Sequence, residues 1–175
     1  MPDAPETIRV IMQRQSCRYF LPDEFPQEHL EWILDAMRWA PSGGNTQPWR
    51  FHVIRGEELK LEIAAAAFGQ RFVAEAPVII AVVALPEISR AQYGERGAEL
   101  YCIQDTAAAV QNAMLAATAL GLGTCWIGSF DEKLAAKALK LAPTERPLAF
   151  IPIGKPKRMG HRTDRKPKDE VVVEE

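Results

Sequence analysis

The sequence lacks the residue patterns on which most catalytic and metal sites are built. Its three cysteines (Cys17, Cys102 and Cys125) show no CxxC spacing, its three histidines are isolated, and no HExxH, GxSxG or Walker pattern occurs. These absences argue against a cysteine zinc site, a disulfide framework and the usual hydrolytic active sites. The odd number of cysteines fits a reducing compartment, so we expect a cytoplasmic protein without a bound metal.

Long apolar runs and a strong net charge are also missing. The longest apolar run, over residues 77–86, is far too short to span a bilayer, and the polar residues 1–9 do not resemble a signal peptide. The formal net charge of −2 gives no general attraction to nucleic acid or to an anionic membrane. The composition is ordinary, with 47% hydrophobic residues and no internal repeat, so we expect one domain over residues 1–175.

Apolar periodicity predicts helices interleaved with strands. Helical spacing predicts helices over residues 7–13, 26–40, 58–68, 98–120 and 131–141, with a further helical turn over 71–76. Alternating or β-branched runs predict strands over residues 49–54, 78–85, 124–127 and 147–153, the second of them central and covered on both faces. The polar segment 86–97 is expected to be a mobile loop, and Val171-Val172-Val173 has the β-branched residues to add an edge strand to some sheet.

Two segments carry candidate binding groups. Arg14-Gln15-Ser16-Cys17-Arg18-Tyr19-Phe20 places two arginines beside a serine, which suits phosphate oxygens, although a solvated basic turn is the alternative. Ala40-Pro41-Ser42-Gly43-Gly44-Asn45-Thr46-Gln47-Pro48-Trp49, which we call the connector, joins a helix to a strand. Its glycines permit positive φ, and its neutral donors and acceptors suit a flat polar ligand. On its chemistry alone, an ordinary turn is the commoner alternative.

Two further groups complete the candidate binding elements: the glycine-rich turn and strand over residues 123–129, and Arg165-Lys166. Residues 155–168 contain seven basic residues against Asp164, for which a solvated tail is the default interpretation. The cysteines are expected to be small core or shell residues, and Cys17 is the one most open to activation, because arginines lie near it. Binding groups without acid–base machinery are typical of a protein whose chemistry is carried by a cofactor.

Taken together, four segments resemble the FMN-dependent nitroreductase family. Residues 14–20 resemble its RRSxRxF opening, the connector its APSxxNxQPW segment, Gly121-Leu122-Gly123-Thr124-Cys125-Trp126-Ile127-Gly128 its GLGTCWIG stretch, and Ile153-Gly154-Lys155-Pro156 with Arg165-Lys166-Pro167 its GxP…RKP ending. The segments occur in the family's order and cover nearly the whole chain. Gln15 departs from the pattern, because the family commonly has a basic residue there, and this predicts that one phosphate contact is weaker or comes from the backbone.

The resemblance implies an α+β fold: a mixed β-sheet flanked by helices on both faces, in an intertwined homodimer with two FMN sites at the interface. The long alanine-rich helix would lie in that interface, and residues 155–175 would form a C-terminal arm packing on the partner subunit. The cofactor contacts that the resemblance implies are Arg14, Gln15, Ser16, Arg18, Pro41, Ser42, Gly43, Asn45, Gln47, Ile127, Gly128, Ser129, Arg165 and Lys166.

The family positions of these residues imply their roles. Arg14 and Ser16 would hold the FMN phosphate with help from Arg165. Arg18 would lie beside the pyrimidine edge of the flavin, where a positive charge stabilises the anionic reduced ring. Pro41, Ser42 and Asn45 of the connector would approach the same flavin from the partner subunit, and residues 127–129 would line the far side of the ring.

The implied activity is hydride transfer from NADH or NADPH through flavin N5 to a small-molecule acceptor such as a nitroaromatic, quinone or enone, in ping-pong order. No side chain would be a catalyst, because flavin N5 carries the chemistry. Two alternatives stay open: another chemistry on the same fold, either reductive dehalogenation or flavin breakdown, and a flavin-binding protein without turnover. A nucleic-acid partner is not expected, and the short segment 86–97 leaves the acceptor undetermined.

Overall fold

The centre of the molecule is a four-stranded antiparallel β-sheet. In the computed structural model, which describes residues 4–175, the strands lie in the order β1 (Trp49–Ile54), β2 (Val78–Ala84), β4 (Arg146–Gly154) and β3 (Gly123–Thr124). Each neighbouring pair is antiparallel, and an isolated parallel bridge joins Ser16 to Thr124. The expected mixed sheet is therefore wrong for these four strands. The chain between residues 54 and 78 returns to the same end of the sheet, whereas the chain between residues 84 and 123 crosses to the opposite end, so each neighbouring pair is antiparallel.

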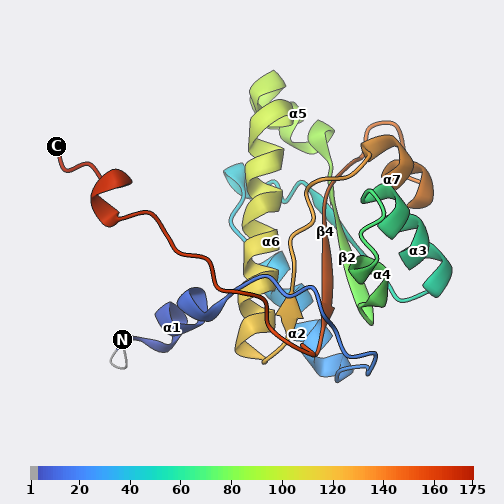
Figure 1. The fold of residues 1–175 in the computed structure, drawn as a ribbon. Helices are drawn as coiled ribbons and strands as arrows, with labels where there is room; N and C mark the ends of the chain where they lie inside the picture. The colour runs from blue at the N-terminus through green and yellow to red at the C-terminus, as the bar shows by residue number, and fades with distance from the viewer. Residues whose placement is uncertain (1–3) are drawn as a thin grey trace.

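Helices cover both faces of this sheet (Figure 1). The α-helices are α1 (Glu6–Gln13), α2 (Gln27–Arg38), α3 (Glu57–Ala66), α4 (Phe72–Glu75), α5 (Pro86–Arg96), α6 (Cys102–Ala119) and α7 (Glu132–Ala138). Shorter turns are the 3-10 helices Gly43–Asn45 and Lys168–Glu170 and the π-helical turn Gly97–Tyr101. α2 and α6 pack on one face, and α3, α4 and α7 on the other, which confirms an α+β fold. Within residues 4–175, every helix is too short or too polar to span a bilayer.

β2 is the central strand, and all of its residues are buried. The side chains of Val78, Ile80 and Val82 pack against α2 and α6, whereas the alternate residues, beginning with Ile79, face α3 and α7. Burying a Val or Ile side chain contributes about 1.5–3 kcal/mol, so a run that is apolar on both sides strongly favours a position between two layers of helices. The prediction of a central strand covered on both faces is confirmed.

Local signals set the ends of α6 and α7. Gly121 follows α6 with φ of 71°, the left-handed conformation in which a glycine ends a helix. Asp131 caps α7, because its Oδ1 accepts hydrogen bonds from the backbone N–H groups of Lys133 and Leu134 at 2.9 and 3.0 Å. The predicted helices over residues 98–120 and 131–141 therefore have the correct end and start, respectively.

The segment predicted to be a mobile loop is helical instead. α5 has Pro86 in its first turn, and Arg90 pairs with Glu87 at 3.1 Å. Gly94, with φ of 60° and ψ of −151°, interrupts the helix, after which the π-helical turn leads into α6. The prediction is wrong because a largely polar surface helix has no clear apolar stripe to reveal it.

The C-terminal arm, residues 155–175, adds no strand to the sheet. It runs past α1 and away from the sheet (Figure 1), and residues 171–173 are exposed. The expected edge strand at these valines is therefore wrong within one chain, because no sheet edge lies beside them. α1 is also uncovered: the side chains of Ile8, Ile11 and Met12 are between 41 and 44% exposed.

Candidate functional site

Backbone pairing brings three of the four candidate segments together. The N–H of Cys17 donates to Thr124 O at 2.7 Å, and the N–H of Lys157 donates to Tyr19 O at 2.9 Å. Gly123 allows the close approach, because a Cβ there would lie 2.7 Å from the Sγ of Cys17. The first segment thus lies between the glycine-rich segment and the start of the C-terminal arm.

A cavity of about 390 Å3 opens beside these paired segments. It is lined by Ile11, Met12, Arg14, Gln15, Ser16, Arg18, Gly160, His161, Arg162, Thr163 and Arg165. The lining contains four arginines, one histidine and no carboxylate, so it suits an anion. Its volume is typical of a small-molecule site. The structure therefore brings Arg14, Gln15, Ser16, Arg18 and Arg165, five of the cofactor contacts that the resemblance implies, to one place.

Two arginines at the cavity donate hydrogen bonds to backbone carbonyl oxygens, whereas one buried side-chain oxygen has no hydrogen-bond partner within the part of the chain that the structure describes. Arg162 Nη2 donates to Met12 O at 2.6 Å, and Arg165 Nη1 donates to Thr163 O at 3.1 Å. The Oε1 of Gln15 is buried and has no hydrogen-bond partner among residues 4–175. A buried acceptor requires a donor, which a hydroxyl group of a bound ligand would supply. Gln15 therefore fits a polar ligand.

The connector is an exposed turn with a strained backbone. Gly44, Asn45 and Gln47 have φ values of 55°, 57° and 49°, in the left-handed region that side chains disfavour. Ser42 Oγ accepts a hydrogen bond from the N–H of Gln47 at 3.0 Å, and Gln47 Nε2 donates to Asn45 Oδ1 at 3.3 Å. Such strain in a polar turn is a common property of binding segments.

The connector and the cavity lie at opposite ends of α6 (Figure 1). The N–H of Gly43 donates to Oδ1 of Asp105, in the first turn of α6, at 3.1 Å. The contact between Cys17 and Thr124, beside the cavity, lies beyond the other end of this helix. The 18 residues of α6 rise about 27 Å. A single chain therefore does not bring the connector to the cavity.

The late glycine-rich segment is anchored through Ile127, which is buried and exchanges backbone hydrogen bonds of 2.9 and 3.0 Å with Phe150. The predicted strand over residues 124–127 is reduced to β3 and this bridge. Gly128 and Ser129 are exposed, so these two are free to face a ligand. Lys166 is exposed and does not line the cavity.

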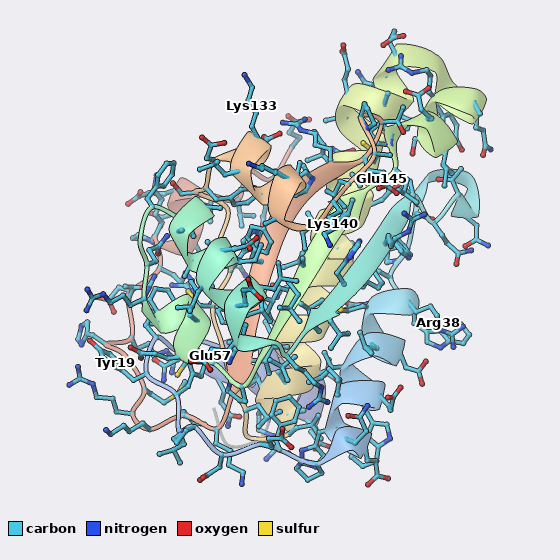
Figure 2. The ribbon with its side chains drawn as sticks, turned by 90° about the vertical axis from the view of Figure 1, so that its right-hand side faces the viewer. Tyr19, Arg38, Glu57, Lys133, Lys140 and Glu145 are labelled. Atoms are coloured by element: carbon cyan, nitrogen blue, oxygen red, sulfur yellow. The ribbon has the colours of Figure 1, made fainter. Side chains whose placement is uncertain are left out.

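A larger hollow of about 630 Å3 lies between α3 and α7, on the face seen in Figure 2. Glu58 and Glu62 of α3 and Lys137 and Lys140 beside them line it, and it contains none of the predicted site residues. Mixed charges of this kind are typical of solvated helix faces. We place the candidate site in the smaller cavity, because charge of one sign and a buried unpartnered acceptor meet there.

The chain resembles known proteins over most of its length. The model of the Nitroreductase family matches residues 11–70 and 64–155. The chain belongs to the nitroreductase family. A protein of Archaeoglobus fulgidus named NADH dehydrogenase/NAD(P)H nitroreductase is 36% identical over 77% of this chain and 74% of its own length. An NADH dehydrogenase of Thermus thermophilus is 31% identical over 93% of this chain and 92% of its own. A solved nitroreductase family protein of Clostridium novyi is 34% identical, with a TM-score of 0.79 over 87% of this chain and 86% of its own.

The nitroreductase family match ends at residue 155, so most of the C-terminal arm lies beyond it. The arm is joined to the matched part by contacts at the cavity. A Cβ on Gly160 would lie 3.3 Å from Ser16 O, and Arg165 lines the cavity together with Arg14. The inclusion of Arg165 in the candidate site therefore rests on this chain's own geometry.

Sequence reasoning missed Asp105. It is the only charged residue of α6, its side chain is 8% exposed, and it holds the N–H of Gly43. Burial raises the pKa of the Asp105 carboxyl group, and the hydrogen bond from Gly43 opposes that shift. The sequence feature that could have identified it is a lone acidic residue in an alanine-rich helix.

The three cysteines are buried, Cys17 included, which confirms that they are small core residues. The Sγ of Cys17 donates to Tyr19 O at 3.3 Å, and burial raises the pKa of its thiol as it does for Cys102 and Cys125. We expect thiol labelling of the folded protein at neutral pH to be at least ~10-fold slower than labelling of the unfolded chain. Timed reaction with a chromogenic disulfide reagent measures this, and rapid labelling of any one thiol before unfolding would contradict it.

Proposed function

We propose that this protein is an FMN-dependent oxidoreductase that takes hydride from NADH or NADPH and delivers it to a small-molecule acceptor such as a nitroaromatic, quinone or enone. The observation that carries the proposal is the cavity where Arg14, Ser16, Arg18 and Arg165 converge. FMN, when bound, supplies the hydride-transfer chemistry, and the chain supplies binding, orientation and charge. The names of the relatives, which include NAD(P)H nitroreductase and NADH dehydrogenase, support this class of reaction.

The basic end of the cavity suits the FMN phosphate. A phosphate monoester carries a charge of about −2 at pH 7, and a guanidinium group binds its oxygens through paired N–H donors. Arg14 and Ser16 are partly buried, which limits screening by solvent, and Arg165 meets them from the arm. The unpartnered Oε1 of Gln15 would accept a hydrogen bond from a hydroxyl of the ribityl chain.

The other contacts would orient the flavin ring. Arg18 is exposed at the cavity, with its guanidinium 6.0 Å from the centre of the Phe72 ring, so it is available to a ligand. A positive charge beside the ring favours the reduced, anionic form. Gly128 and Ser129 are exposed on the neighbouring segment and would line the opposite side.

We further propose that two copies of the chain form an intertwined homodimer with shared FMN sites. A site that contains both the cavity and the connector requires a second copy, because α6 separates them within one chain. The exposed apolar side chains of Ile8 and Ile11 on α1 and of Val171–Val173 on the arm would be covered by the partner. Two-fold symmetry would repeat the same contact and produce two equal sites.

Anaerobic reduction tests the proposed activity. We expect purified protein loaded with FMN to lose its oxidised-flavin absorbance on addition of NADH or NADPH, and to recover it when a nitroaromatic or quinone is added. Steady-state rates at several acceptor concentrations should give parallel double-reciprocal lines, because donor and acceptor would use the same exposed flavin face in turn.

Three other results would point elsewhere. Flavin that is bleached by dithionite but not by excess NADH and NADPH would indicate a flavin-binding protein without this activity. Permanent loss of the flavin spectrum in the presence of oxygen would indicate flavin breakdown, and halide release from a halogenated aromatic would indicate dehalogenation. A protein that does not bind FMN at all would overturn the proposal.

A further inference from the structure

Asp105 is a buried carboxylate that holds the connector. Its Oδ1 accepts the N–H of Gly43 at 3.1 Å, and its Oδ2 is buried without a hydrogen-bond partner among residues 4–175. Burying a carboxylate has a high free-energy cost unless its hydrogen bonds compensate for the loss of water. Ala109, Ala113 and Ala117, which are buried on the same helix, carry no such cost. The packing of α6 therefore does not by itself require an acid at position 105.

A simpler explanation is that the Asp105 carboxylate stabilises α6 itself, because a negative charge near a helix N-terminus interacts favourably with the positive end of the helix dipole. That explanation does not require a hydrogen bond to any other segment. Its Oδ1 nevertheless reaches a backbone N–H that is 62 residues away in the sequence. The carboxylate therefore fixes a distant segment as well as its own helix.

Neighbouring side chains leave the connector little freedom. A Cβ on Gly43 would lie 3.5 Å from the ring of Tyr93 and 3.7 Å from that of Tyr101, two rings that contact each other edge to face at a centroid distance of 5.2 Å. A Cβ on Gly44 would collide with the side chains of Gln92 and Tyr93. The connector backbone is thus packed directly against α5 and the start of α6.

The connector depends on these contacts to keep its conformation, because its backbone is strained. Left-handed residues other than glycine persist only where surrounding contacts impose that conformation, and Asn45 and Gln47 are both of this kind. The bond from Gly43 to Asp105 lies at the start of the same 3-10 turn. Its loss would let the turn relax and would move the polar groups of Ser42 and Asn45.

We propose that Asp105 is a positioning residue for the cofactor site: it fixes the connector of one subunit so that Ser42 and Asn45 meet the flavin bound by the partner subunit. This inference rests on the proposed function. Asp105 itself does not contact the cofactor and acts through the N–H of Gly43. α6 then has two roles, since its first turn holds the connector and its far end leads into the segment that pairs with the cavity.

A double-mutant cycle on FMN affinity tests the inference. We expect Asp105→Ala to raise the FMN Kd about 10-fold, because a hydrogen bond to a charged group is lost. Asp105→Asn keeps an acceptor oxygen and should recover most of the affinity, and the exposed Glu99→Gln should leave it unchanged. If Asp105 acts through the connector, its effect should largely disappear in a background that carries both Ser42→Ala and Asn45→Ala, since residues that act through the same contacts are not additive. In an Arg14→Ala background, by contrast, Asp105→Ala should raise the FMN Kd by the same factor as it does in the otherwise wild-type protein.

Each outcome separates the inference from the proposed function. Kd values are measured at a fixed protein concentration, with folding and assembly state checked by circular dichroism and light scattering. If Asp105→Ala does not fold, Asp105→Ser replaces it, because a serine is too short to reach Gly43. Wild-type FMN binding with unchanged affinity in the variant would overturn the inference alone. Equal coupling to Arg14 and to the Ser42 and Asn45 pair would also overturn it, because it would indicate a general loss of structure. A wild type that does not bind FMN would overturn the proposed function itself.

Discussion

Replacing Arg14 with alanine is expected to weaken FMN binding about 10- to 100-fold. The side chain is partly buried in a cavity whose lining has four arginines and no carboxylate. A hydrogen bond to a charged group contributes about 1.5–3 kcal/mol, and every ~1.4 kcal/mol corresponds to a factor of ten in Kd. Quenching of flavin fluorescence on titration with protein measures the change.

Riboflavin, which lacks the phosphate, supplies the sharpest control for Arg14→Ala. If Arg14 binds the phosphate, the substitution should weaken FMN binding and leave riboflavin binding unchanged. Arg14→Lys should be intermediate, because it keeps the charge but loses the planar pair of donors. Arg38→Ala should have no effect, since Arg38 is exposed on α2 (Figure 2) and pairs with Asp35 at 3.0 Å. Equal loss of FMN and riboflavin affinity in Arg14→Ala would contradict a phosphate contact.

The parts of the fold that sequence predicted well are those that local chemistry decides. The run Val78–Ala84 is apolar at every position and rich in β-branched residues, which favours a strand between two layers of helices. α2 has Leu30, Ile33 and Met37 at helical spacing, and all three are buried. Asp131 and Gly121 have the side chain, or the lack of one, that a helix end needs. Patterns of this kind need no knowledge of the rest of the chain.

The parts that sequence missed are decided by distant contacts. α5 is polar on its surface, and what holds it in place is its packing near the connector, where Tyr93 meets Tyr101. The valines at 171–173 have strand propensity but are exposed and join no sheet among residues 4–175, and propensity alone does not show which sheet a strand would join. Asp105 looked like an ordinary helix residue until the N–H of Gly43 was placed against it.

In the candidate site too, local residue types could be recognised from the sequence, whereas contacts between distant segments could not. The residue types in the first segment predicted an anion site, and the structure adds that Arg165 comes to it across more than a hundred residues of sequence. The connector's polar groups were also recognised from sequence. Its position at the far end of α6 from the cavity depends on the sheet topology and could not be predicted from residue spacing.

That separation leads to a second prediction with a large effect: two defective variants should restore each other's FMN binding in a mixed dimer. One variant is Arg14→Ala, and the other carries Ser42→Ala and Asn45→Ala in the connector. If each site combines the cavity of one subunit with the connector of the other, every site in either homodimer lacks one set of contacts. A heterodimer instead has one site with both defects and one site with neither.

Co-expression with two different affinity tags, followed by tandem purification, gives the heterodimer alone. We expect it to bind about one FMN per dimer with wild-type affinity, at concentrations where neither homodimer is saturated, and to regain about half of the wild-type rate with NADH or NADPH, since one of two equivalent sites is intact. A wild-type dimer carrying the same two tags controls for the purification. If each site were built within one chain, the heterodimer would hold one site without Arg14 and one without the connector contacts. It would then bind FMN no better than the two homodimers, and that result would overturn the shared-site proposal.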